Sequence, residues 1–239
     1  MVVRRSLFWP SFFALGALLV LLGLGTWQVE RVFWKERLIA ERHAAVTAPP
    51  IDLPRSAETA RGLEFHRVRV EGRFLNDREL FLGATDDDGH PGYHVIAPLR
   101  LSSGAILLVD RGFIPEARKA PASRAQGELE GPVTVTGLLR LAPEGKPHWF
   151  LPDNSVERNY WFWVDIPAMA AAAQLDRVLP FYVDADATPN PGGLPQGGQT
   201  RLELPNNHLQ YAITWYALAA ALVVIYTVFI RRRAQGDVR

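Results

Sequence analysis

Two long apolar runs constrain this chain of 239 residues more than any other feature. One run covers residues 7–24 and the other covers residues 209–230, and neither contains Asp, Glu, Lys or Arg. At about 1.5 Å per helical residue the runs span roughly 27 and 33 Å, close to the hydrocarbon thickness of a bilayer. We therefore predict a membrane protein with two transmembrane α-helices, at 7–29 and 207–230.

Basic residues flank both runs on the side of the chain termini. The segment 1–6 contains Arg4 and Arg5, and the segment 231–239 contains four more arginines. Since short basic segments stay in the cytoplasm, we expect both termini there and the central domain on the other side of the membrane. Six residues leave no room for a mitochondrial presequence, so we expect the bacterial inner membrane and a periplasmic domain.

A cleaved signal peptide is the alternative interpretation of the first run. Gly23 and Gly25 are small residues at a plausible cleavage spacing. Two observations favour the transmembrane helix instead: the run is longer than a usual signal core, and Trp27 is typical of a membrane interface.

The charge and the cysteine count exclude several classes of partner and site. Without the six arginines of the tails and Asp237, the rest of the chain has 20 basic and 24 acidic residues, a net charge of about −4. This weak acidity argues against nucleic acid as a partner, because phosphate binding requires a clustered basic surface. The absence of cysteine excludes disulfides and metal–thiolate sites.

The polar segments suggest a simple domain order. Helical periodicity continues after the first run and predicts an amphipathic helical extension at 30–47, which Pro49 and Pro50 end. An extracytoplasmic domain follows at 48–187. The stretch "TPNPGGLPQGGQ" then predicts a Pro/Gly-rich linker at 188–206, before the second membrane helix.

Alternation of apolar and polar residues predicts the strands of this domain. The candidate strands are "FHRVRVEGRF", "ELFLG", "YHVIAPLRL", "AILLVDRGFIP", "VTVTGLLRL", "YWFWVDI" and "PFYVDAD". The alanine-rich segment 166–175 predicts a short helix. Many strands with one inserted helix indicate an α+β domain with a mainly antiparallel sheet.

Catalytic motifs are absent from the sequence. Asp86, Asp87 and Asp88 lie beside His90, but their spacing does not match a calcium loop, and a solvated turn is the simpler interpretation. No serine lies in a G-x-S-x-G turn, and the glycines match no nucleotide-binding spacing. The sequence does not indicate an enzyme.

His208 is the one residue whose position suggests chemistry. Pro205 cannot continue a helix, and Asn206 or Asn207 is a favoured N-cap, so His208 falls in the first turn of the second membrane helix. The positive end of the helix dipole disfavours an imidazolium there. A neutral imidazole is what an axial metal ligand requires, so His208 is a candidate metal ligand.

Other residues share the side of the helix on which His208 lies. Ala212 and Ala219 would permit close approach of a helix or a flat macrocycle, and Tyr211 and Trp215 would flank it. The alternative is that His208, Tyr211 and Trp215 form only an interfacial belt.

Several motifs resemble the surfeit locus protein 1 family. They are "LGTWQVERVFWKERLIA", "FHRVRVEGRF", "GYHVIAPLRLSSGAILLVDRGFIP" and "NNHLQYAITWYALA", and the resemblance covers residues 23 to about 223. One departure is Asp110, where the family often has asparagine. Trp27, Gln28 and Arg31 match the family motif without an assigned chemical task.

The resemblance implies an assembly factor for haem-copper cytochrome c oxidase of the aa3 type. It implies haem a as the bound cofactor, with His208 as the axial ligand of the haem iron. Helical spacing adds Tyr211 and Trp215 as the residues beside the haem. Subunit I of the oxidase is the implied partner, and haem a synthase is a further candidate.

Two other classes remain open at this point. A structural scaffold would stabilise a subunit I intermediate without binding haem. A two-helix membrane sensor would need a cytoplasmic signalling module, which the short segments outside the two runs do not provide.

Overall fold

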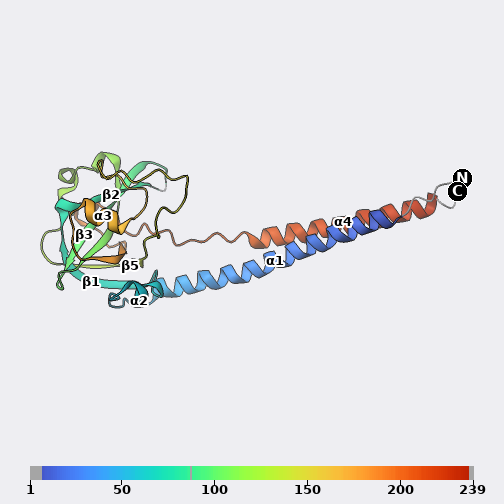
Figure 1. Ribbon diagram of the computed structural model, residues 1–239, viewed down its shortest axis with the longest axis horizontal. Coiled ribbons are helices and arrows are strands. Elements are labelled where there is room, and N and C mark those ends of the chain that lie inside the picture. Colours follow the sequence, from blue (N-terminus) through green and yellow to red (C-terminus); the bar gives the residue numbers. More distant parts are fainter. Residues whose placement is uncertain (1–6, 87, 237–239) are drawn as a thin grey trace. The chain divides into compact units, whose positions relative to one another are not determined.

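The computed structural model describes residues 7–86 and 88–236 (Figure 1). Predictions that concern residues 1–6, Asp87 and residues 237–239, including the basic residues Arg4, Arg5 and Arg239, fall outside the described residues. The chain divides into two units. One unit contains residues 1–41 and 203–239, and the other contains residues 42–202.

The first unit is a pair of long helices. Helices α1 (Phe8–Thr47) and α4 (His208–Gly236) are each long and apolar enough to cross a membrane. Helix α1 continues without a break from the first apolar run through the charged stretch 30–47. Figure 1 shows the two helices side by side, α1 in blue and α4 in red.

Small residues let α1 and α4 approach closely. Ala212 and Ala219 of α4 are buried, and so is Gly25 of α1. A Cβ added at Gly25 would lie 2.8 Å from the ring of Tyr216, so only glycine fits there without rearrangement. Close approach through small residues is the usual basis of helix association in membranes.

The described residues of the second unit form six strands. They are β1 (Arg67–Phe74), β2 (Leu80–Thr85), β3 (Pro91–Leu101), β4 (Ile106–Pro115), β5 (Val133–Arg140) and β6 (Val178–Ala185). Short helices connect them: α2 (Ala57–Arg61), α3 (Ile166–Ala172), and 3₁₀ turns at Asn76–Arg78, Glu116–Arg118, Pro121–Gly127 and Pro191–Gly193. The predicted helix at 166–175 is therefore confirmed as α3.

The strands form a closed barrel, which the sequence did not predict. Their order is β1-β5-β6-β4-β3, and β1 pairs again with β3 through Gly72↔Leu101 and Phe74↔Leu99. The first half of β3 pairs with β2 instead. The sheet is mainly antiparallel, as expected, but β4 and β6 run parallel. This parallel pairing arises because β6 lies between β4 and β5, antiparallel to β5.

Alternating residues give the barrel an inner and an outer apolar cluster. Leu107, Val109 and Phe181 point into an interior shared by all five closing strands. Leu108 and Tyr182, from the same strands, lie on the outer face beneath α3. This is the period-2 pattern that the sequence indicated.

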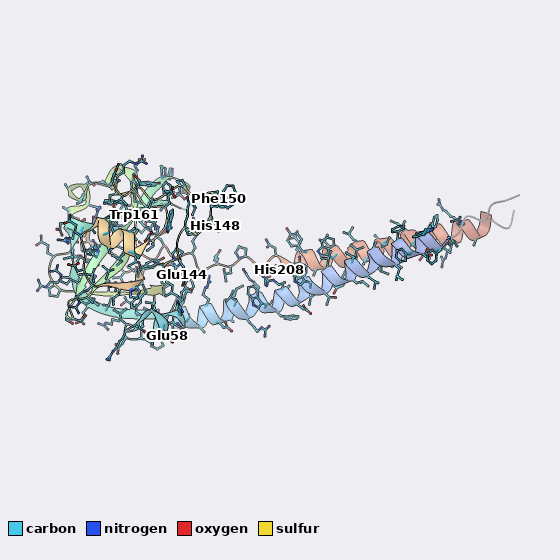
Figure 2. All side chains as sticks on the ribbon, in the orientation of Figure 1. Glu58, Glu144, His148, Phe150, Trp161 and His208 are labelled. Atoms are coloured by element: carbon cyan, nitrogen blue, oxygen red, sulfur yellow. The ribbon has the colours of Figure 1, made fainter. Side chains whose placement is uncertain are left out.

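The segment 160–166 is not a strand, although its composition predicted one. Trp161 forms a single bridge with Leu82, and its indole Nε1–H donates to Asn159 Oδ1 at 3.0 Å. Trp161 is fully buried on the outer face of the barrel, and Figure 2 labels it beside α3. Asp165 is the N-cap of α3, since its carboxylate accepts from Ala168 N at 3.0 Å. The segment therefore covers the sheet instead of extending it.

Much of the Pro/Gly-rich stretch at 188–206 packs on the barrel. Gln196 exchanges two backbone hydrogen bonds of 2.9 Å with Phe113 of β4. Gly112 makes this contact possible, because a Cβ at Gly112 would lie 1.9 Å from the carbonyl oxygen of Gln196. Gly112 also has φ +109°, a conformation that other residues rarely adopt.

We predict that Gly112→Ala destabilises the protein by at least about 2 kcal/mol, because it adds both backbone strain and a clash with Gln196. Thermal unfolding of the detergent-solubilised chain, followed by tryptophan fluorescence, measures this. Gly62→Ala is the matched control, since nothing lies within 4 Å of a Cβ at Gly62. Equal melting temperatures for the two variants would contradict the prediction.

Candidate functional site

His208 begins the helix in which the sequence placed it. It is the first residue of α4, and Tyr211 N donates to Asn207 O at 3.3 Å, so the helical hydrogen bonds start at Asn207. Figure 2 shows His208 at the start of α4. The side chain is half-buried.

A hydrogen bond to α1 orients the imidazole of His208. Its Nδ1–H donates to Oε1 of Gln28 at 2.7 Å, across 180 residues of sequence. Gln28 is only 9% exposed, so this contact lies between the two helices. With the proton on Nδ1, Nε2 carries a free lone pair, and it accepts no hydrogen bond within the described residues. Histidine ligands of metals are commonly oriented in this way, through the nitrogen that does not bind the metal.

The other predicted residues of α4 differ in how exposed they are. Trp215 is half-buried and lies in the row that faces α1, together with His208, Ala212 and Ala219. Tyr211 is 55% exposed and lies outside that row. The small side chains of Ala212 and Ala219 therefore pack against α1.

Two polar atoms near the His208–Gln28 contact have no partner among the described residues. They are Nε of Arg31 and Oδ1 of Asn206, and both are buried. The guanidinium of Arg31 lies 4.0 Å from the ring of Trp34. Because the helices run antiparallel, Arg31 and Asn206 follow the contact toward the same end of the pair. A buried polar atom without a partner is costly, which favours a ligand or water at this end.

A second polar site lies on the barrel, around a cavity of about 380 Å³. His94 of β3, Asp110 of β4 and Asp184 of β6 line it, together with Arg140 of β5. Backbone register brings them together, since Asp110 and Asp184 are direct neighbours on the parallel strands. Arg201, also in the lining, follows the segment packed on the barrel.

Hydrogen bonds join these four side chains in two pairs. His94 Nδ1–H donates to Asp110 Oδ2 at 2.7 Å, and Asp110 Oδ1 accepts from Gly112 N at 2.9 Å. Arg140 Nη1 donates to Asp184 Oδ2 at 2.6 Å, and the hydroxyl of Thr200 donates to the same oxygen at 2.9 Å. Asp110 is thus the partner of His94.

Burial and neighbouring charges shift the titration of this cluster. Burial, together with the negative charge of Asp110, raises the pKa of Asp184 to about 6, against the opposing effect of Arg140. Burial alone would lower the pKa of His94, but its hydrogen bond to Asp110 and the charges of Asp110 and Asp184 outweigh burial, so the pKa is raised.

The acidic turn at 86–90 is explained by its own hydrogen bonds. Asp86 Oδ1 accepts from the backbone N–H of Asp88 at 3.1 Å and of His90 at 2.8 Å. The backbone hydrogen bond from His90 is the main reason that the pKa of Asp86 is lowered. Asp86, Asp88 and His90 place ligand atoms within 4.8 Å of one another, but Asp88 and His90 are exposed. This agrees with a solvated turn.

A buried ion-pair cluster explains part of the motif "VDRGFIP". Arg111 is 2% exposed and donates to the carbonyl oxygen of Gly127 at 2.5 Å and to Asn190 Oδ1 at 3.2 Å. Arg124 is 5% exposed and pairs with Glu79, which is 7% exposed. These contacts bind the 3₁₀ turns to the barrel, and their role is structural.

The raised pKa of Asp184 predicts a pH-dependent stability. The folded state holds the proton up to about pH 6, whereas an ordinary aspartate loses it near pH 3.8. The stabilisation from this proton is therefore present below pH 3.8 and is lost as the pH rises to about 6, by no more than about 3 kcal/mol.

Asp184→Asn removes this titration, so we expect the wild-type protein to lose stability relative to the variant between pH 4.5 and 7. Melting temperatures over that range measure the effect. Asp153→Asn, whose side chain is 88% exposed, is the control and leaves the wild-type pH dependence unchanged. A constant difference between wild type and Asp184→Asn across the range would contradict the assignment.

Comparisons with known proteins match nearly the whole chain. Residues 15–220 match the SURF1 family. Surfeit locus protein 1 of Mus musculus is 40% identical over 226 residues, which cover 88% of this chain and 72% of that protein. A SURF1-like protein of Monosiga brevicollis is 40% identical over 227 residues, covering 90% of this chain and 84% of that protein. Surfeit locus protein 1 of Homo sapiens is 38% identical over 215 residues, covering 83% of this chain and 70% of that protein.

Proposed function

The chain belongs to the SURF1 family, and from this premise we propose that it is an assembly factor for haem-copper cytochrome c oxidase of the aa3 type. In this proposal His208 binds haem a as cargo, and the protein assists delivery of the haem to subunit I. The proposed location is the bacterial inner membrane, with both termini in the cytoplasm and the barrel in the periplasm. Two apolar helices and the basic residues that follow the second one support this location.

The hydrogen bond between Gln28 and His208 carries the proposal. It places the imidazole proton on Nδ1 and leaves Nε2 free to bind the haem iron. A haem also has two propionate carboxylates, and the guanidinium of Arg31 offers the charge that pairs best with a carboxylate. The buried Nε of Arg31 and Oδ1 of Asn206, both without partners in the described part of the chain, support a polar ligand at this end.

A single histidine suits a carrier better than a closed site with two histidines. Transfer requires the protein to release the haem, and one protein ligand with an exchangeable opposite position binds more weakly than two. Trp215 and Tyr211 would contact the macrocycle from α4. Haem a synthase is the proposed donor of the haem, and subunit I is the proposed acceptor.

The proposed activity is binding and transfer, not catalysis. The cavity on the barrel contains the His94–Asp110 pair, but no serine is among the residues described around it. The hydroxyl of Thr200 already donates to Asp184. Thr85 and Tyr182 are the other hydroxyl-bearing residues of the lining, and among the described residues no hydrogen bond joins either of them to His94.

A structural scaffold is the second candidate function. Ala212 and Ala219 are buried, so the small-residue face of α4 is already filled by α1. In that case the helix pair needs no macrocycle to be well packed, and the protein would stabilise a subunit I intermediate without haem.

We predict that His208→Ala abolishes haem a binding. The full-length protein is co-expressed with the haem a synthesis enzymes, purified in detergent and measured by its optical spectrum and by pyridine haemochrome analysis. His148→Ala, which changes an exposed histidine of the other unit, is the control and retains the haem. A variant His208→Ala with full haem content would contradict the role of His208, and a colourless wild-type protein would favour the scaffold.

We also predict that Gln28→Leu weakens haem a binding about 10- to 100-fold, because Nδ1 of His208 loses its acceptor. Gln28→Glu restores an acceptor and should retain binding near the wild-type level. Thr26→Val is the matched control, since it removes a different contact between the helices, the 3.1 Å hydrogen bond to Tyr216. Equal haem affinity in Gln28→Leu and wild type, measured by haem titration, would show that Gln28 does not orient His208.

A further inference from the structure

We propose that the cavity on the barrel binds a small oxyanion, a molecule that carries a carboxylate or a phosphate, through His94 and Arg201. This site lies entirely within residues 42–202 and does not depend on haem binding by His208. Its volume of about 380 Å³ is near the lower end of the usual range for small-molecule sites, about 300–1,000 Å³.

The cavity is polar because alternate residues of β4 and β6 point to opposite faces of the barrel wall. Val109 and Val183 point into the apolar interior of the barrel, so Asp110 and Asp184, the next residues, point to the outer face. Further along the same strands α3 covers this face, over Leu108 and Tyr182. Beyond that cover, the outer face opens into the cavity.

Both carboxylates in the cavity are already neutralised. Each oxygen of Asp110 accepts a hydrogen bond, one from His94 and one from the backbone of Gly112. Asp184 accepts from Arg140 and from Thr200. The two acidic residues therefore each have a basic partner, and neither charge is left to attract a cation.

Two groups in the cavity can donate to an anion: Nε2 of His94 when the imidazole is protonated, and the guanidinium of Arg201. Nε2 of His94 makes no hydrogen bond in the described ranges, although Nδ1 is held by Asp110. Arg201 lines the same cavity, is exposed, and forms no ion pair or hydrogen bond with any described residue. When His94 is protonated, three cationic groups face at most two carboxylates, because Asp184 holds a proton up to about pH 6. The surplus of at least one positive charge favours an anion.

The charged neighbours of His94 favour its protonated form. Asp110 on β4 and Asp184 on β6 both favour the imidazolium, whereas Arg201 opposes it, and Arg140 and Tyr182 complete the titratable groups of the cavity. A bound anion offsets the effect of Arg201. Anion binding and protonation of His94 should therefore strengthen each other.

A divalent cation fits this cavity poorly. Three ligand atoms of His, Asp or Glu within 4.8 Å of one another occur, among the described residues, only at Asp86, Asp88 and His90. The unpaired guanidinium of Arg201 would also repel a cation from the cavity.

The first test measures binding of acetate and of inorganic phosphate to the full-length protein in detergent. Histidine is labelled with ¹³C, and His94→Gln assigns the resonance of His94 among the six histidines. We expect 20 mM acetate or phosphate to raise the apparent pKa of His94 by at least half a unit. Acetate keeps one charge across the range, so its affinity should be about tenfold higher at pH 5.5 than at pH 8. If acetate alone acts, the site is for carboxylates, and if phosphate alone acts, it is for phosphates.

Variants separate the two groups that hold the anion. Arg201→Gln should abolish the anion-dependent shift, whereas Arg73→Gln, which changes an exposed arginine of β1, should leave it intact. Asp110→Asn keeps an acceptor for Nδ1 of His94 but removes the charge, so anion binding should move to lower pH. The proposal is overturned if neither anion shifts His94, or if the shift persists in Arg201→Gln.

Discussion

The parallel pairing of β4 with β6 is the contact on which the rest of the barrel depends. It closes the ring of five strands by holding β6 between β4 and β5. The segment between β5 and β6 contains Trp161 and α3, which bury the outer face of the strands. The same pairing places Asp110 beside Asp184, so one register determines the closure, the outer core and the charged cavity.

A bilayer, which both helices are long and apolar enough to cross, would impose a different physical rule on the helix pair. In a bilayer, apolar side chains gain little by leaving lipid for another helix, so close packing and polar contacts determine how helices associate. Gly25, Ala212 and Ala219 provide the close packing between α1 and α4. Gln28 and His208 provide a polar contact of 2.7 Å. A hydrogen bond of this kind selects one register of the pair, and it also determines which nitrogen of His208 is free.

Local sequence patterns predicted the elements well, because each pattern reflects a local cause. Alternation around Val68 and Val70 indicated a strand with one buried face, and Pro205 with two asparagines indicated the start of α4. The strand predicted at 160–166 was wrong, because a strand-like composition does not show whether the backbone pairs with a neighbouring strand. The Pro/Gly-rich stretch was read as a linker, since no local signal shows that Gln196 binds the strand at Phe113.

The sites were less predictable than the elements, because they join distant residues. His208 could be found from its place at the helix start, but its partner Gln28 is 180 residues away and was indicated only by a family motif. His94, Asp110 and Asp184 come together through strand register, which no short motif encodes. The resemblance singled out Asp110, but its contact with His94 is visible only in the folded chain.

The closed ring leaves β2 as the strand with an unpaired side, and the chain protects that side. Trp161 N donates to Phe81 O at 2.9 Å, and Gly83 N donates to Trp161 O at 2.8 Å. Exposed strand edges are templates for pairing with other chains, and they promote aggregation. A domain that folds without any disulfide has no covalent link to prevent such pairing. The aromatic segment at 160–166, which is not a strand itself, therefore covers the free edge of β2.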